Sequence, residues 1–182
     1  MNTHRTVPTQ FIEAAGIRFA YRRLANPRFG ESPDIPLLFF MHFTGTMDHW
    51  DPALTDGFAQ DRDVILFNNA GVSRARKENR DPLPNEKVAP AQVAALQKWG
   101  APAKDPYAYL KRIVQPTPLV NSSNDVIIYT VNSYILQQHL PNAQLILYPD
   151  SNHGSQYQYP ELFVEHVTQV PEGLNKKSWL HI

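Results

Sequence analysis

The sequence predicts an α/β fold with a mostly parallel sheet, an N-terminal antiparallel hairpin and helices on both faces. Apolar runs of strand length are followed by segments in which apolar residues recur at helical spacing. This alternation occurs both before and after a charged middle segment. Strands that alternate with helices need crossover connections, and such connections give parallel pairing. A length of 182 residues, 42% of them hydrophobic, predicts one domain with a core of its own.

The first half of the chain predicts a hairpin followed by a strand, a helix and a second strand. Apolar and polar residues alternate on either side of Gly16, which is typical of antiparallel pairing. The run LLFFMHF is apolar nearly throughout, as in a strand that is covered on both faces. In chain order, the predicted elements are a hairpin at 9–24, a strand at 37–43, a helix around 50–58 and a strand at 64–69.

The second half repeats the alternation. A strand is predicted at 117–122, an amphipathic helix at 130–140, a strand at 142–148 and a final helix that begins at Pro160. In sheets of this kind, ligands bind at the loops that follow the carboxyl ends of the strands. The loops after the predicted strands are therefore where functional side chains are expected.

Charge and composition exclude several classes of function. Seventeen basic residues balance seventeen acidic ones without long runs of either sign, so no nucleic-acid or membrane partner is expected. The absence of cysteine excludes disulfides, thiolate metal sites and a cysteine nucleophile. No apolar run has the length of a secretory core or a membrane span. We therefore expect a cytoplasmic protein with a small-molecule partner.

Three of the loops hold residues suited to acyl-transfer chemistry. Asp125 follows one strand and could orient an imidazole, and His153 follows another and could act as a general base. The amides of Phe43 and Thr44, next to Gly45, could bind an oxyanion. Each has a structural alternative, because Asp125 could serve only as a turn or cap residue, His153 as a surface residue and the third loop as a plain strand-to-helix connection.

The segments HFTGTMDHWDP, ILFNNAGVS and NDVIIYTVNSYILQQHLPNAQLILYPDSNHGSQYQYPELF carry a family resemblance. With them, the chain resembles the α/β-hydrolase family, in its small esterase-like and haloperoxidase-like branch. The resemblance implies an ester-type hydrolase with no metal and no organic cofactor. It also implies that Asp125 and His153 are the acid and the base of a Ser-Asp-His triad.

The chain departs from that family where the nucleophile belongs. Members carry a much longer segment between the strand matching VILFNNAG and the segment matching NEKVAPAQ, and it holds the Gly-x-Ser-x-Gly elbow and most of the cap. No two of the eight glycines here are four positions apart, so the chain has no such motif. Ser73 is the nearest substitute, but the charged RARKENRDP after it cannot form the buried helix of an elbow. Ser122, Ser123 or a residue of a partner subunit remain as alternatives.

We therefore predict a single truncated domain, 1–182. It comprises an N-terminal half at 1–72, a charged junction and cap remnant at 73–112, a C-terminal half at 113–168 and an atypical tail at 169–182. Closing the gap would make the strands at 37–43 and 117–122 direct parallel neighbours. Val93, Leu96 and Trp99 would then form the apolar stripe available to cover the sheet, so exposed apolar surface or a homodimer is expected. The expected function is that of an esterase relative with little or no activity.

Overall fold

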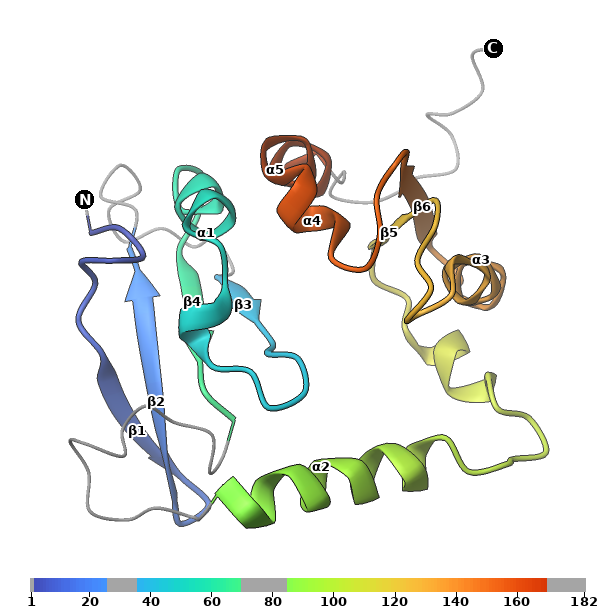
Figure 1. Cartoon of the computed structure of the whole chain (residues 1–182), viewed down its shortest axis with the longest axis horizontal. Coiled ribbons are helices and arrows are strands. Elements are labelled where there is room, and N and C mark those ends of the chain that lie inside the picture. Colours follow the sequence, from blue (N-terminus) through green and yellow to red (C-terminus); the bar gives the residue numbers. More distant parts are fainter. Residues whose placement is uncertain (1, 26–35, 70–84, 170–182) are drawn as a thin grey trace. The chain divides into compact units, whose positions relative to one another are not determined.

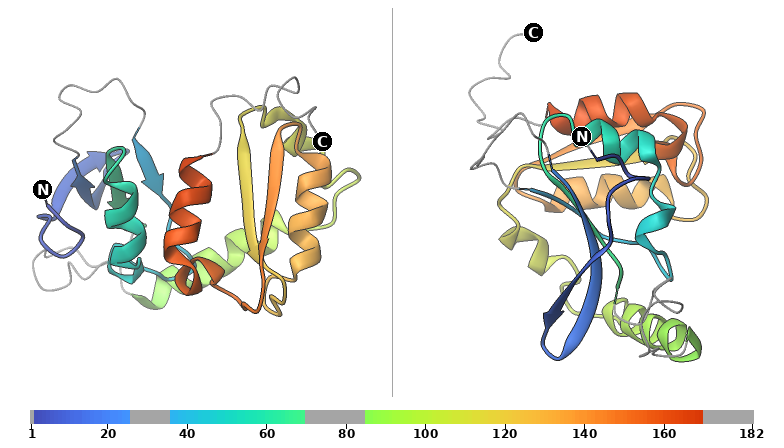
Figure 2. Two further views of the ribbon diagram at one scale, coloured as in Figure 1. Left: turned by 90° about the horizontal axis from the view of Figure 1, so that it is seen from above. Right: turned by 90° about the vertical axis from the view of Figure 1, so that its left-hand side faces the viewer.

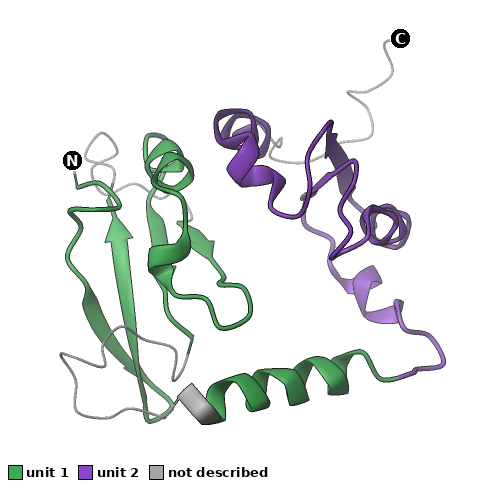
Figure 3. Cartoon of the chain, in the orientation of Figure 1, with its two compact units in different colours: residues 1–101 green, residues 102–182 purple. Residues whose placement is uncertain are grey.

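The computed structural model of the chain describes residues 2–25, 36–69 and 85–169. Ser73 and the tail from residue 170 onward lie outside the described residues. The chain divides into two compact units, 1–101 and 102–182 (Figure 3), and each is described by itself. This division falls inside the junction predicted at 73–112, and the prediction of a single domain stays a prediction.

Unit 1 contains a four-stranded sheet in the order β1-β2-β4-β3 (Figure 1). The predicted hairpin is confirmed: β1 and β2 pair antiparallel, with Ala14 opposite Ile17. Its two turn residues, Ala15 and Gly16, both have positive φ, at 50° and 74°, as a type I′ turn requires. The strands of the sheet are β1 (Gln10–Ala14), β2 (Ile17–Leu24), β3 (Leu37–Phe39) and β4 (Val64–Phe67).

β4 occupies an inner position of the unit 1 sheet. β4 lies between two partners, antiparallel to β2 and parallel to β3, which leaves β3 at one edge of the sheet. The strands at 37–43 and 117–122 belong to different units, so the prediction that they are direct neighbours stays a prediction. The sequence pattern identified these strands and the pairing of the hairpin, but not the place of β4 between β2 and β3.

One face of the unit 1 sheet is covered by α1 (Pro52–Phe58). The helix begins with Asp51 as its N-cap, whose Oδ1 accepts the Ala53 amide at 2.8 Å. Its apolar side buries Leu54 and Phe58. Phe58 meets Phe39 of β3 edge-on, with ring centroids 5.9 Å apart.

The opposite face of this sheet keeps large apolar side chains at the surface. Successive residues of a strand point to opposite faces, so Leu38 and Phe40 point away from the face on which Phe39 meets α1. Their side chains are 44% and 70% exposed. The predicted covering stripe on α2 (Asn85–Trp99) is exposed as well, and Trp99 reaches 74%. These exposures agree with the expected apolar surface, and the choice between exposed surface and a homodimer stays a prediction.

Unit 2 confirms the predicted strand, helix and strand of the second half. Strands β5 (Thr117–Ser122) and β6 (Ala143–Tyr148) pair in parallel, from Thr117 opposite Ala143 to Ser122 opposite Tyr148. The connecting helix α3 (Thr130–His139) packs against both strands (Figure 2). The remaining elements are the short 3-10 helices η2 (Met47–His49) of unit 1 and η4 (Ala108–Arg112) of unit 2, and the helices α4 (Ser155–Gln158) and α5 (Pro160–Thr168) of unit 2.

Tyr148, the last residue of β6, ties the final helix to the small sheet of unit 2. Its side chain is buried, and its hydroxyl lies 3.1 Å from Nδ1 of His166 on α5. Burial, followed by the nearby charge of Glu165, raises the pKa of Tyr148, so the phenol stays protonated. No helix in the described parts of the chain combines the length and the apolar character needed to cross a membrane.

Candidate active site

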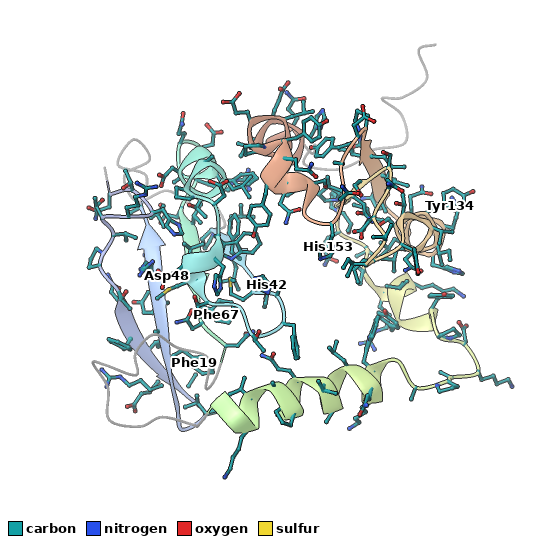
Figure 4. All side chains as sticks on the ribbon, in the orientation of Figure 1. Phe19, His42, Asp48, Phe67, Tyr134 and His153 are labelled. Carbon is teal, nitrogen blue, oxygen red and sulfur yellow. The ribbon has the colours of Figure 1, made fainter. Side chains whose placement is uncertain are left out.

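The two residues predicted as acid and base meet at the carboxyl ends of β5 and β6. Nδ1 of His153 lies 3.0 Å from Oδ2 of Asp125. The carboxylate is buried, whereas the imidazole side chain is 54% exposed. Figure 4 marks His153 on the loop that follows β6. The prediction that these two side chains lie within hydrogen-bonding reach is confirmed.

The second carboxylate oxygen of Asp125 is held by the backbone. Oδ1 accepts the amides of Ile127 and Ile128, each at 2.9 Å. Burial of the carboxyl group favours its neutral form, but the hydrogen bonds from His153, Ile128 and Ile127 and the charge of His153 outweigh burial. Together they hold the pKa of Asp125 below its ordinary value. Asp125 is therefore an ionised acceptor at neutral pH.

The loop that carries Asp125 is fixed by side chains that bond the backbone. The Thr130 hydroxyl donates to the Ser122 carbonyl at 2.8 Å and accepts the Asp125 amide at 3.2 Å. Nδ2 of Asn121 donates to the Ile128 carbonyl at 3.3 Å. Asp125 thus acts as a turn residue and as the partner of His153 at the same time, so the two alternatives considered from the sequence are compatible.

The loop that carries His153 depends on two residues with left-handed backbone. Asp150 has φ 46° and Gly154 has φ 89°, a conformation that glycine adopts freely and that aspartate tolerates better than most residues. The Ser151 hydroxyl donates to the Tyr148 carbonyl at 3.0 Å, which anchors the loop to the end of β6. His153 is thereby held with Nδ1 toward Asp125, and its Nε2 has no hydrogen-bond partner among the described residues.

An imidazole oriented by an ionised carboxylate can serve as a general base. Two of the serines considered as alternatives, Ser122 and Ser123, lie at the carboxyl end of β5. Ser122, one of the alternatives, is fully buried, and its hydroxyl has no partner within the described ranges. That burial excludes it from attacking a substrate. Ser123 is exposed, and its amide donates to the Tyr148 carbonyl at 2.8 Å.

The predicted oxyanion turn lies in unit 1, between β3 and η2. Thr44 has a left-handed φ of 55°, which is strained for a β-branched residue. Its amide already donates to Oε1 of Gln92 on α2, at 2.9 Å. At Gly45 an added Cβ would lie 2.7 Å from Cε1 of the His42 ring, so a larger residue there would displace this exposed side chain. An oxyanion role for Phe43 and Thr44 stays a prediction, and for Thr44 it would require displacement of Gln92.

Sequence reasoning missed the partners of these groups. The amides of Ile127 and Ile128 were not anticipated, although the polar NSSND segment is a recognisable turn signal. The bond from Gln92 has no local sequence signal. In the part of the chain that the structure describes, no group of three or more His, Asp or Glu side chains could hold a metal ion.

Comparison with known proteins agrees with the fold. No family model matches the chain. A stretch of 57 residues is 40% identical to the pimeloyl-[acyl-carrier protein] methyl ester esterase of Nitrosomonas europaea, but it spans only 31% of this chain and 23% of that protein.

Similar solved structures are hydrolases. An alpha/beta hydrolase fold protein from Chitinophaga pinensis is 28% identical, with a TM-score of 0.69 over 91% of this chain and 98% of its own. A predicted CIB-like hydrolase from Thermoplasma acidophilum is 16% identical, with a TM-score of 0.62 over 88% and 95% of the two chains. Est816, an N-acyl homoserine lactone degrading enzyme, is 15% identical, with a TM-score of 0.60 over 87% and 99%. The chain is therefore an α/β-hydrolase-fold protein related to esterases.

Proposed function

We propose that this chain is a relative of enzymes that hydrolyse small neutral esters. It has little or no serine-type esterase activity of its own. The observation that carries the proposal is the bond between Asp125 and His153 in a chain without a Gly-x-Ser-x-Gly motif. The base and its orienting carboxylate are in place, but the group that they would activate is missing.

The ester class is supported by the relatives. The printed name of the Nitrosomonas protein describes a methyl ester esterase, and that of Est816 describes a lactone-degrading enzyme. Both reactions attack an acyl carbon bonded to oxygen. A cytoplasmic location and a shortened catalytic domain belong to the same proposal.

Hydrolysis of p-nitrophenyl acetate by the purified protein and by Ser73→Ala tests this proposal. Without a serine nucleophile, a triad enzyme keeps only about 10³–10⁴-fold acceleration over water. We expect the unchanged protein to stay at or below that level, and Ser73→Ala to behave like it.

Two results would contradict the proposal. Fast turnover that disappears in Ser73→Ala would make Ser73 the nucleophile of an active hydrolase. Fast turnover that persists in Ser73→Ala, and whose rate per chain rises with protein concentration, would point to a residue supplied by a partner subunit.

A further inference from the structure

The imidazole of His153 presents a free nitrogen beside a fixed carboxylate. Its Nδ1 faces Asp125, its side chain is about half exposed, and its Nε2 has no hydrogen-bond partner among the described residues. We infer that His153 is itself a nucleophile, which attacks activated neutral esters through Nε2. This inference rests on the proposed function, in which no serine takes the nucleophilic role.

The hydrogen bond to Asp125 selects the reactive tautomer. An ionised carboxylate can only accept hydrogen bonds, so Nδ1 must carry the proton in the contact with Oδ2. In the neutral ring, the lone pair then lies on Nε2. The amides of Ile127 and Ile128 keep Asp125 in place from its other oxygen. Asp125 is therefore a positioning residue for the nucleophile.

The surface beside this pair suits an apolar, uncharged ester. Residues 126–129 are Val-Ile-Ile-Tyr, and each side chain is more than half exposed. Two of these residues donate their amides to the same carboxylate that binds His153, so the apolar loop starts next to the imidazole. No charged side chain occurs from 126 to 134. The occupant that we infer is the acyl group of a neutral aryl ester.

The reaction balances without any further reactant but water. Nε2 of His153 bonds to the ester carbonyl carbon, and the bond from that carbon to the aryl oxygen breaks, with the electron pair leaving on the phenolate. The resulting acyl-imidazolium keeps its Nδ1 proton on the hydrogen bond to Asp125. Water then adds to the acyl carbon, the bond to Nε2 breaks, and a carboxylic acid and a proton are released.

Rates with p-nitrophenyl acetate and p-nitrophenyl butyrate test the inference, with the full chain and its variants His153→Gln, Ser73→Ala and His139→Gln. The chain has seven histidines. If all of them reacted equally with the ester, His153→Gln would lower the rate by only one seventh. We expect a loss of more than about half, because only a dominant nucleophile produces it. His139→Gln is the matched control: this residue stacks on Tyr107, at 4.3 Å between ring centroids, and should keep the full rate.

Three further readouts do not depend on the folding of the His153 variant. Mass spectrometry of the acid-quenched unchanged protein should find the acyl group on the peptide that contains His153. Ile127→Ser should raise KM for the butyrate ester about threefold, with a smaller effect for the acetate, because the longer chain loses more apolar contact. In Asp125→Asn, nitrogen NMR of His153 should show a mixture of tautomers together with a slower reaction.

The outcomes separate this inference from the proposed function. A loss of activity in Ser73→Ala overturns both. An unchanged rate in His153→Gln, or an acyl group on another residue, overturns the inference and leaves the absence of serine-type turnover standing. Equal KM changes for both esters in Ile127→Ser overturn the assignment of the apolar loop.

Discussion

His4 is a buried histidine that the fold holds in its neutral form. Its Nδ1 lies 2.9 Å from the Thr55 hydroxyl of α1, and the side chain is buried in unit 1. Burial, followed by the positive charge of Arg22, lowers the pKa of His4 below its ordinary value of 6.5, and three nearby aspartates oppose this only in part.

This lowered pKa predicts a loss of stability on mild acidification. The unfolded chain binds the proton more readily than the folded chain, so the contribution of His4 is complete above pH 6.5 and is lost as the pH falls below it. We expect the stability advantage of the unchanged protein over His4→Gln, measured by urea unfolding, to be larger at pH 8 than at pH 5.5. An advantage of equal size at both values would show that protonation of His4 is not coupled to folding.

Some residues of the candidate site could be predicted from the sequence, and some of their contacts could not. Asp125 and His153 could be found because each follows a strand, and parallel strands end at a common edge. The bond from Gln92 to Thr44 could not be found, because it joins residues 48 positions apart through the placement of a helix. The burial of Ser122 could not be predicted either. Ser122 and Ser123 are adjacent in NSSND, and the sequence does not show that the first is buried and the second is exposed.

Among the elements, the hairpin of β1 and β2 has a turn that its sequence does not fully suit. Ala15 has φ 50°, a left-handed value that costs alanine more than asparagine or glycine. Ala15→Asn creates the Asn-Gly pair preferred in such turns, so we expect a gain of about 0.5–1 kcal/mol in the free energy of unfolding. Urea unfolding measures it. Ala14→Asn is the control, because residue 14 lies in the strand, where asparagine is unfavourable. A loss of stability in Ala15→Asn would contradict this explanation.

The elements were predictable where periodicity was clear, and so was the pairing within the hairpin, whereas the pairing of β4 was not. The hairpin, β5, α3 and β6 follow from alternation, helical spacing and apolar runs. The antiparallel pairing of β2 with β4 does not follow from the sequence. A short apolar run indicates a buried strand but does not identify the neighbouring strand.

For the molecule as a whole, the exposed apolar residues of unit 1 suggest a partner. We propose that the edge strand β3 and the sheet face that carries Leu38 and Phe40 bind a second copy of this chain. An edge with no charged residue from 37 to 43 lacks the protection that edge strands normally carry, whereas β1 at the other edge includes Glu13. A net charge of zero removes the electrostatic repulsion between copies.

Light scattering and sedimentation test this association. We expect a dimer that dissociates in Phe40→Lys, because the lysine would place a charge in the apolar contact. Ile12→Lys is the matched control, since Ile12 is also more than half exposed but lies on the opposite edge strand. A monomer at all concentrations, or equal dissociation in both variants, would refute the proposed interface.

The position of β4 between β2 and β3 also sets an order of local opening in unit 1. Its backbone has ladder partners on both sides, whereas β1 and β3 each have a partner on one side only among the described strands. Amide hydrogens exchange with solvent when their bonds open, and bonds inside a sheet open least often. In deuterated water, the amides of Val64–Phe67 should therefore retain their protons longest, and those of the two outer strands should lose them first.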